Sequence, residues 1–208
     1  MELYYCEVLN PRKACAVARY LNSPVEFVRV DLAKGQQGTP EFLALNPNGK
    51  VPVLRDGDFV LWESNAIMCE LARRAKSDLW PNDERQIEVL RWLSFDARHF
   101  THYSGALYFE YVIKPWAGIG EADEAKVAEA LKGFKTSAAV VDGHLQSRNF
   151  LLGEQLSVAD FALSAAFPYA QVAKLPLAEF PAIQRWHARL RDLPAWREPF
   201  PTRERAAA

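Results

Sequence analysis

The stretch NPNGKVPVL (residues 46–54), followed shortly by WESNAI (residues 62–67), decides the fold. The apolar runs VPVL and FVLW are separated by RDGD (residues 55–58), whose Asp-Gly pair is a strong signal for a β-hairpin. Pro52 suits the opening of the first strand, where its missing N–H need not join the ladder. Because apolar residues recur at helical spacing from Ser64 onward, a helix is predicted directly after the second strand.

Toward the N-terminus, the sequence predicts a β-α-β unit. ELYYC (residues 2–6) has the aromatic-rich pattern of a strand, and VEFVRVDL (residues 25–32) ends in period-two alternation. Between them, Asn10-Pro11 is typical of an N-cap followed by proline at the first helical position, which predicts a helix over residues 11–21. A short helix in PEFLALN then completes the order β-α-β-α-β-β-α before residue 77.

Toward the C-terminus, the composition changes in KSDLWPNDERQ (residues 76–86), which is polar and is followed only by helical patterns. A domain boundary is predicted there, with domains at residues 1–77 and 84–208. Four helices are expected in the second domain, at residues 83–113, 121–147, 157–172 and 180–191. Lys114-Pro115 is expected to end the first of them. The predicted fold class is therefore a two-domain α+β protein.

Charge and composition exclude several classes of partner. The 208 residues include 25 Lys+Arg and 26 Asp+Glu, and the net charge of -1 argues against nucleic acid, because such binders need a concentrated basic surface. We expect no secretory signal, because the start MELYYCEVLNPRK lacks a charged region followed by an apolar one. We expect no membrane span, because the longest apolar stretch is too short to cross a bilayer. Cys6, Cys15 and Cys69 have no CxxC spacing and fit free thiols in a reducing cytoplasm. The histidines lack metal-ligand spacing, so no metal is expected.

The stretch FLLGEQLSVADFALSAAF (residues 150–167) predicts a structural motif of the helical region. Ser157 and Asp160 have the spacing of a capping box directly before an apolar run. With the hairpin and the Glu63-Ser64 pair that follows it, this motif resembles the cytosolic glutathione S-transferase superfamily, as a bacterial-type member with the subclass left open. The resemblance covers nearly the whole chain. It implies a thioredoxin-like βαβαββα domain, an all-helical C-terminal bundle and a cytoplasmic homodimer.

The resemblance also implies a site for glutathione as co-substrate. A cis peptide bond before Pro52 would turn the backbone of Val51 outward to pair with the cysteine of glutathione. Ser64 and the helix start would take the α-carboxylate of the γ-glutamyl end, Glu63 would answer its ammonium group, and Lys50 could reach the glycine carboxylate. Each residue has a structural alternative as well: a trans edge-strand proline, a helix N-cap, a solvated carboxylate and an exposed loop lysine.

A transferase must also activate the glutathione thiol, because a pKa of about 8.5 leaves it mostly protonated at neutral pH. The family places a Tyr, Ser or Cys near the end of the first strand or the start of the first helix, but YYCEVLNPRK (residues 4–13) contains no serine. Asn10 could donate from its amide to the thiolate at the positive end of the helix, or it could only cap that helix. Tyr5 and Cys6 are the other candidates, and packing is the alternative for both.

The electrophile pocket is expected between the two domains. Phe95, His99, His102 and Tyr103 recur at helical spacings and could line such a pocket, or they could belong to the core or a dimer interface. The predicted function is the conjugation of reduced glutathione to a hydrophobic electrophile. The alternatives are a glutathione-dependent isomerase, dehalogenase or thiol transferase, and a non-catalytic binding protein of the same fold.

Overall fold

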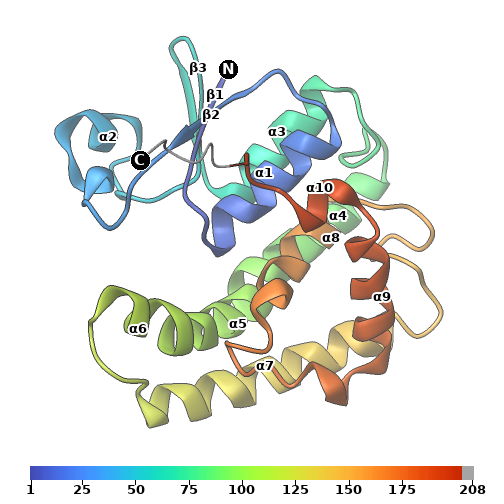
Figure 1. The fold of residues 1–208 in the computed structure, drawn as a ribbon. Coiled ribbons are helices and arrows are strands. Elements are labelled where there is room, and N and C mark those ends of the chain that lie inside the picture. The colour runs from blue at the N-terminus through green and yellow to red at the C-terminus, as the bar shows by residue number, and fades with distance from the viewer. Residues whose placement is uncertain (203–208) are drawn as a thin grey trace.

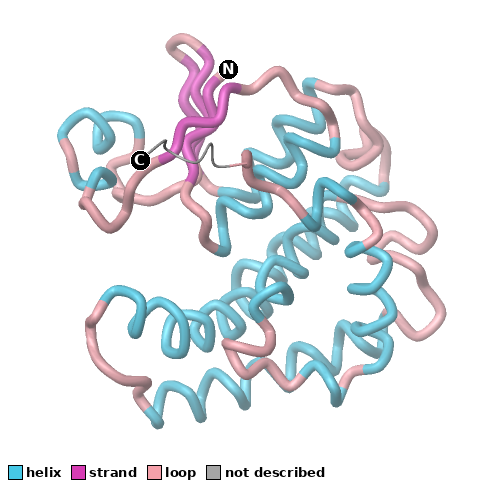
Figure 2. The backbone as a smooth tube through the Cα atoms, viewed as in Figure 1, coloured by secondary structure: helices cyan, strands magenta, loops and turns pink. Residues whose placement is uncertain are grey.

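A four-stranded mixed sheet organises the first part of the chain in the computed structural model, which describes residues 1–202 (Figures 1 and 2). Its strands are β1 (Glu2–Tyr5), β2 (Glu26–Arg29), β3 (Val53–Asp56) and β4 (Phe59–Trp62), in the spatial order β2-β1-β3-β4. Strand β1 pairs parallel with β2 and antiparallel with β3, and β3 forms the predicted hairpin with β4. Gly57 supplies the positive φ of 62° that this tight turn needs.

Helices cover both faces of the sheet. Helices α1 (Leu9–Tyr20) and α3 (Ser64–Arg74) lie on one face, and α2 (Pro40–Leu45) lies on the other (Figure 1). Side chains alternate along each strand. Leu3 and Leu54 are therefore buried against the first pair of helices, whereas Val53 packs with Phe42 of α2. The predicted order β-α-β-α-β-β-α is confirmed.

One long helical rod opens the second part of the chain. It consists of α4 (Arg85–Phe95), a π-helical turn (Asp96–Phe100), α5 (Thr101–Tyr108), a second π-helical turn (Phe109–Ile113) and α6 (Lys114–Ala117). The expectation that Lys114-Pro115 ends this helix is wrong. The π turn before Pro115 already interrupts the regular ladder, so the proline removes no ordinary α-helical bond there. The rod ends instead at Gly118, whose φ of 65° is left-handed.

Further helices pack around this rod. They are α7 (Glu124–His144), α8 (Val158–Leu163), α9 (Pro181–Arg191) and α10 (Pro194–Arg197), with short 3-10 turns at Gln36–Gly38, Leu177–Glu179 and Ser164–Tyr169. The expected helix over residues 157–172 is only partly correct, because it changes to a 3-10 turn at Ser164, ahead of Pro168. No helix among residues 1–202 is both long enough and apolar enough to cross a membrane.

Asp160 is fully buried in the helical region and accepts hydrogen bonds from several segments. Its carboxylate accepts from the backbone N–H of Ser157 at 2.8 Å, from the backbone N–H of Leu151 at 2.9 Å and from the indole Nε1 of Trp186 at 2.9 Å. The predicted capping box with Ser157 is present. Complete burial raises the pKa of Asp160 to about 6, against the opposing effect of these hydrogen bonds. One carboxylate thus ties a loop, α8 and α9 together.

Candidate active site

A pocket of about 450 Å³ lies at the junction of the two regions. Its first wall comes from the start of α1 and from the loops that precede α2 and β3. Its second wall is a stripe along α5, the π turn and α6, formed by Thr101, His102, Gly105, Tyr108, Phe109, Ile113 and Trp116. Figure 1 shows the start of α1 facing the α5–α6 segment, and residues of both line the pocket. Its position between domains is typical of a small-molecule site.

The loop before β3 presents its backbone to this pocket. The peptide bond between Val51 and Pro52 is cis, so the trans edge-strand alternative is wrong. Asn46 is buried and donates from Nδ2 to the carbonyl of Lys50 at 2.7 Å, which holds the loop from within. Gly49 has a φ of 60°, and a β-carbon there would lie 3.2 Å from the carbonyl oxygen of Gln37. Lys50 and Val51 both line the pocket.

The Glu63-Ser64 pair forms the start of α3. Glu63 is the N-cap residue, with a φ of 74°, and Ser64 is already the first helical residue, so the alternative that Ser64 is the N-cap is wrong. The bond from the Ile67 N–H to the Glu63 carbonyl begins the helical ladder. The N–H groups before Ile67 are therefore available to an anion. Glu63 lines a neighbouring groove of about 630 Å³, and Ser64 is buried; neither residue lines the 450 Å³ pocket.

Asn10 is the one proposed activator that lines the pocket. Helix α1 begins at Leu9 with Val8 as its N-cap, so the expected helix start at Pro11 and the capping role of Asn10 are both wrong. The first helical turn accepts Pro11 because N–H groups there have no intrahelical partner in any case. Asn10 is exposed, and its amide makes no hydrogen bond with any residue of the described chain. Its donor is free to meet a ligand.

Tyr5 and Cys6 lie elsewhere. Tyr5 is only 4% exposed, and its ring contacts Phe27 edge-on and stacks on Phe200 at a centroid distance of 5.8 Å. Cys6 is also buried, and its Sγ lies 3.6 Å from Oε2 of Glu7. Burial, and then the charge of Glu7, raise the pKa of the Cys6 thiol, which is the opposite of what a nucleophilic cysteine requires. Neither residue lines the pocket.

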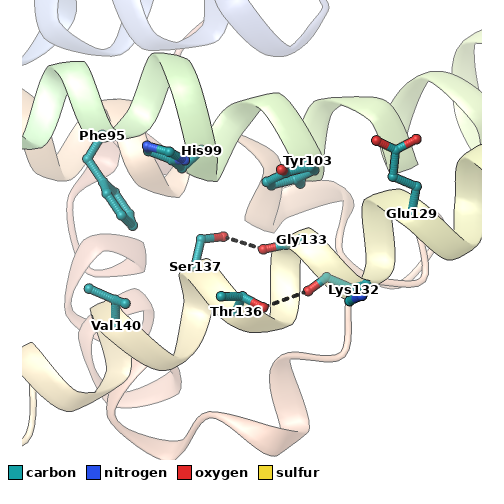
Figure 3. Close-up of a pocket in the computed structure, with 9 residues that line it drawn as sticks. All are labelled: Phe95, His99, Tyr103, Glu129, Lys132, Gly133, Thr136, Ser137 and Val140. Atoms are coloured by element: carbon teal, nitrogen blue, oxygen red, sulfur yellow. Dashed lines mark hydrogen bonds between the residues drawn. The ribbon is translucent and has the colours of Figure 1, made fainter.

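The four residues expected in the electrophile pocket are divided between two cavities. His102 lines the 450 Å³ pocket. Phe95, His99 and Tyr103 line a separate cavity of about 350 Å³ against α7 (Figure 3). His99 and His102 are three positions apart, and His99 lies within the π turn of the helical rod. Because of this spacing, the two side chains lie on different sides of the rod. Tyr103 lies directly over Gly133 of α7, where a β-carbon would overlap its ring.

Sequence reasoning missed the apolar half of the pocket wall. Tyr108, Phe109, Ile113 and Trp116 continue the stripe that begins at His102. The available signal was the recurrence of large side chains at helical spacing beyond Tyr103. Because a helix end was predicted at Lys114-Pro115, Trp116 was not assigned to the same helix.

A fully buried ion pair supports both walls of the pocket. Lys13 of α1 and Asp96 of the π turn are 2% and 0% exposed, and Nζ lies 2.9 Å from Oδ2. Asn65, next to Ser64, donates from Nδ2 to the same oxygen at 3.2 Å, and the hydroxyl of Thr101 donates to the other oxygen. The network therefore joins the start of α3 to the pocket wall.

The charges around the pocket are few. Lys50 and His102 are the basic residues of its lining, and no Asp or Glu lines it within the described part of the chain. Across residues 1–202, no group of three or more His, Cys, Asp or Glu side chains is arranged to hold a metal ion. The pocket thus favours neutral or anionic ligands over cations.

Comparisons with known proteins agree with this architecture. The model of the glutathione S-transferase N-terminal domain matches residues 3–73, and that of the C-terminal domain matches residues 98–194. The chain is 30% identical over 194 residues to a probable glutathione S-transferase, GSTF2, of Oryza sativa subsp. japonica, covering 89% of this chain and 88% of that protein. Glutathione S-transferase 1 of Zea mays is 32% identical over 204 residues, covering 94% and 93% of the two chains.

Solved structures give the same result. A glutathione S-transferase-I bound with lactoylglutathione superposes with a TM-score of 0.85 at 28% identity, covering 95% of this chain and 97% of that one. A glutathione S-transferase from Pseudomonas fluorescens superposes with a TM-score of 0.84 at 32% identity, covering 93% and 96%. The matches span both halves of the fold and the pocket between them. This chain therefore belongs to the glutathione S-transferase family.

Proposed function

We propose that this protein conjugates reduced glutathione to hydrophobic, electrophilic small molecules. The observation that carries the proposal is the pocket between the regions, which has a polar backbone wall at Val51 and an apolar wall that ends in Trp116. Such a pocket holds a peptide thiol beside an apolar electrophile, and proximity of this kind accelerates a bimolecular reaction strongly. The curated relatives named glutathione S-transferase support the same activity.

Glutathione would extend from the start of α1 to the start of α3. We propose that the backbone of Val51, before the cis bond to Pro52, pairs with its cysteinyl residue, because an exposed extended segment binds a peptide in this way. Ser64 and the free N–H groups of α3 would take the γ-glutamyl carboxylate, and Glu63 its ammonium group. Lys50, which lines the pocket, would attract the glycine carboxylate.

Asn10 is the proposed activator of the thiol. Its exposed amide lies in the pocket at the positive end of α1, where both a donated hydrogen bond and the helix dipole favour a thiolate. Tyr5 and Cys6 are disfavoured by their burial and by their positions outside the pocket lining. This also disfavours thiol transfer through Cys6. Isomerase or dehalogenase chemistry would use the same thiolate and differs only in the substrate.

The direct test is a pH titration of the ultraviolet absorbance of the thiolate of protein-bound glutathione. The parent should show a thiol pKa below that of free glutathione, and Asn10→Ala should raise it again. Ser64→Ala should weaken binding without changing the pKa of the glutathione that is bound. Binding with an unshifted pKa would contradict the transferase mechanism and favour a non-catalytic binding protein.

We also propose that the protein is a homodimer. The groove of about 630 Å³ at β4, α3 and α4 spans both regions and includes Phe59, Leu61, Leu90 and Leu93. Phe59 and Leu90 are 42% and 44% exposed, an apolar surface that a second copy would cover. Leu90→Glu should convert the dimer to monomer in sedimentation velocity, whereas Val172→Glu, at an exposed site outside this groove, should not.

Two organisational expectations remain proposals. We place the domains at residues 1–77 and 84–208, which agrees with a polar linker after α3, although the last six residues lie outside the described part of the chain. We place the protein in the cytoplasm, because Cys6, Cys15 and Cys69 are free thiols. Limited proteolysis would test the boundary, and fractionation of cells would test the location.

A further inference from the structure

We propose that His102 is a further catalytic residue, which donates a proton to electrophiles that develop negative charge on oxygen when sulfur adds to them. Enones and epoxides are the substrate classes that require such a donor. The inference rests on the proposed conjugating function and refines it. The proposed role of His102 distinguishes electrophiles that must take up a proton after sulfur adds from electrophiles that release a stable anion.

The position of His102 supports this role. It lines the same pocket as Asn10, on the opposite wall from the start of α1, so that an electrophile attacked near Asn10 lies between the two. The imidazole is exposed and makes no hydrogen bond or ion pair with any residue among 1–202. Its ring contacts Tyr103 edge-on, with a centroid distance of 4.9 Å. Tyr103 packs in turn against Gly133. The ring that the imidazole contacts is therefore restrained by α7.

The charges that face His102 suit a proton donor. Lys50, from the loop across the pocket, and Tyr108, from the same rod, are the titratable groups that share the lining with it. Behind the adjacent Thr101, Asp96 is neutralised by its buried pair with Lys13. Because no carboxylate among residues 1–202 lines the pocket, an oxyanion formed there meets no like charge from them. Imidazole is the side chain that ordinarily exchanges a proton near neutral pH.

The proposed step balances for an enone. The glutathione thiolate forms a bond to the β-carbon, the electron pair of the C=C bond shifts to give an enolate, and the imidazolium of His102 protonates that enolate. The proton released when the glutathione thiol ionised returns the imidazole to its starting state. For an epoxide, the C–O bond breaks and the alkoxide takes the proton. In the displacement of chloride from chlorodinitrobenzene, chloride leaves with its electron pair and no proton is needed.

Tyr108 is a second candidate donor in the same wall, because the Thr101 hydroxyl already donates to Asp96, and pH distinguishes Tyr108 from His102. Its ring packs on Tyr169 with a centroid distance of 4.8 Å, and the side chain is 6% exposed. Burial raises the pKa of Tyr108, so its phenol stays protonated over the working range. A contribution from Tyr108 would therefore not change with pH between 6 and 9.

The test compares benzylideneacetone, an enone, with chlorodinitrobenzene in the full-length protein. His102→Gln should lower kcat/KM for the enone by about 100-fold and for the chloride displacement by a few-fold at most. In the parent, the ratio of enone to displacement rates should fall as the pH rises from 6 to 9, because a proton donor of the imidazole class depends on pH near neutrality and a phenol does not. In His102→Gln the ratio should not change with pH. His99→Gln, whose side chain lines the other cavity, is the matched control and should behave as the parent.

Several results would overturn the inference. Equal loss with both substrates in His102→Gln would make His102 a pocket-shaping residue. A pH-dependent ratio that survives in His102→Gln would exclude the imidazole, and a selective loss of enone addition in Tyr108→Phe alone would transfer the role to Tyr108. If the parent turns over chlorodinitrobenzene but not the enone, the inference fails while the proposed function stands. If the parent turns over neither substrate, both fail.

Discussion

The two walls of the pocket are built in different ways. The wall before β3 is held by hydrogen bonds within its own loop, such as that from Asn46 to Lys50, and it offers backbone groups to a ligand. The helical wall offers side chains, and Trp116 and Phe109 are 57% and 42% exposed. A fixed backbone suits a constant ligand such as glutathione. Exposed side chains on one helical stripe can be changed singly, and such a surface suits a variable electrophile.

The largest effect is expected from a variant that disrupts the buried ion pair between the two walls. Lys13→Met removes one partner of the buried pair with Asp96 and should lower the free energy of unfolding by about 3–5 kcal/mol, because a carboxylate stays buried without its cation. Urea denaturation measures this. Lys135→Met, which removes an exposed pair with Glu179, is the control and should cost less than about 1 kcal/mol. Equal effects would mean that the buried pair does not hold the walls together.

The helical region that carries the second wall is stabilised by the hydrogen bonds of Asp160. Asp160→Ala leaves the buried donors of Leu151, Ser157 and Trp186 without an acceptor and should cost about 3 kcal/mol of unfolding free energy. Ser157→Ala removes only the hydroxyl part of the cap and should cost about 1 kcal/mol. Thermal and urea unfolding of both variants would show the difference. A loss confined to the glutathione affinity of Asp160→Ala, without loss of stability, would contradict this role.

Acid should weaken the helical region through His187. Burial lowers the pKa of His187 to about 4, and its Nε2 has no partner among the described residues. As the pH falls, the unfolded chain binds a proton at His187 near pH 6.5, whereas the folded chain binds it only near pH 4. The stability that depends on neutral His187 is therefore fully present above pH 6.5 and is lost as the pH falls from 6.5 to 4. The loss is about 3 kcal/mol at most. Asp160 has the opposite effect, because its pKa is raised in the folded chain. Protonation of its carboxyl in acid therefore favours the folded chain.

The His187 effect is isolated by difference. His187→Gln should remove the acid-dependent part of the unfolding free energy between pH 6.5 and 4 while leaving the contribution of Asp160 in place. Urea unfolding at several pH values, with the parent beside the variant, gives the difference curve. A flat difference curve would show that His187 titrates equally in the folded and unfolded chain.

A smaller effect is expected at the start of α3, where we propose that the γ-glutamyl end of glutathione binds. Ser64→Ala should raise KM for glutathione about tenfold, because it removes the hydrogen bond that we propose to the γ-glutamyl carboxylate, and should leave KM for the electrophile within twofold of the parent. Initial rates with each substrate varied in turn measure both constants. Ser147→Ala, at an exposed position after α7, is the control. A change in the electrophile KM instead would contradict the proposed binding of glutathione at the start of α3.

The smallest effect is expected at the pocket rim. Trp116→Ala removes apolar contact from the helical wall and should lower kcat/KM for an apolar electrophile by about fivefold, with KM for glutathione unchanged. Val172→Ala, at another exposed apolar side chain, should change neither constant. Parallel changes in both constants would show that the walls are not independent.

The sequence predicted the features that depend on neighbours in the chain. Asp56-Gly57 between two apolar runs fixed the hairpin, and the helix that begins at Ser64 followed from local periodicity. The start of α1 was misplaced because proline is accepted throughout the first helical turn, and sequence alone does not choose between its positions.

The site was predicted less completely, for two physical reasons. The pair of Lys13 and Asp96 joins residues 83 positions apart, and no local pattern indicates that contact. The π turn at Asp96–Phe100 changes which residues share a face, so a regular helical period cannot assign His99 and His102 to their separate cavities.

The contact between Tyr103 and Gly133 has a consequence for how this protein can evolve. Because the Tyr103 ring occupies the space of a side chain at position 133, any larger residue there requires a smaller one at position 103 (Figure 3). Each single change leads to a clash or a void, and only the double change restores the packing. The two positions should therefore covary among descendants of this sequence, and the route between their combinations passes through less stable intermediates.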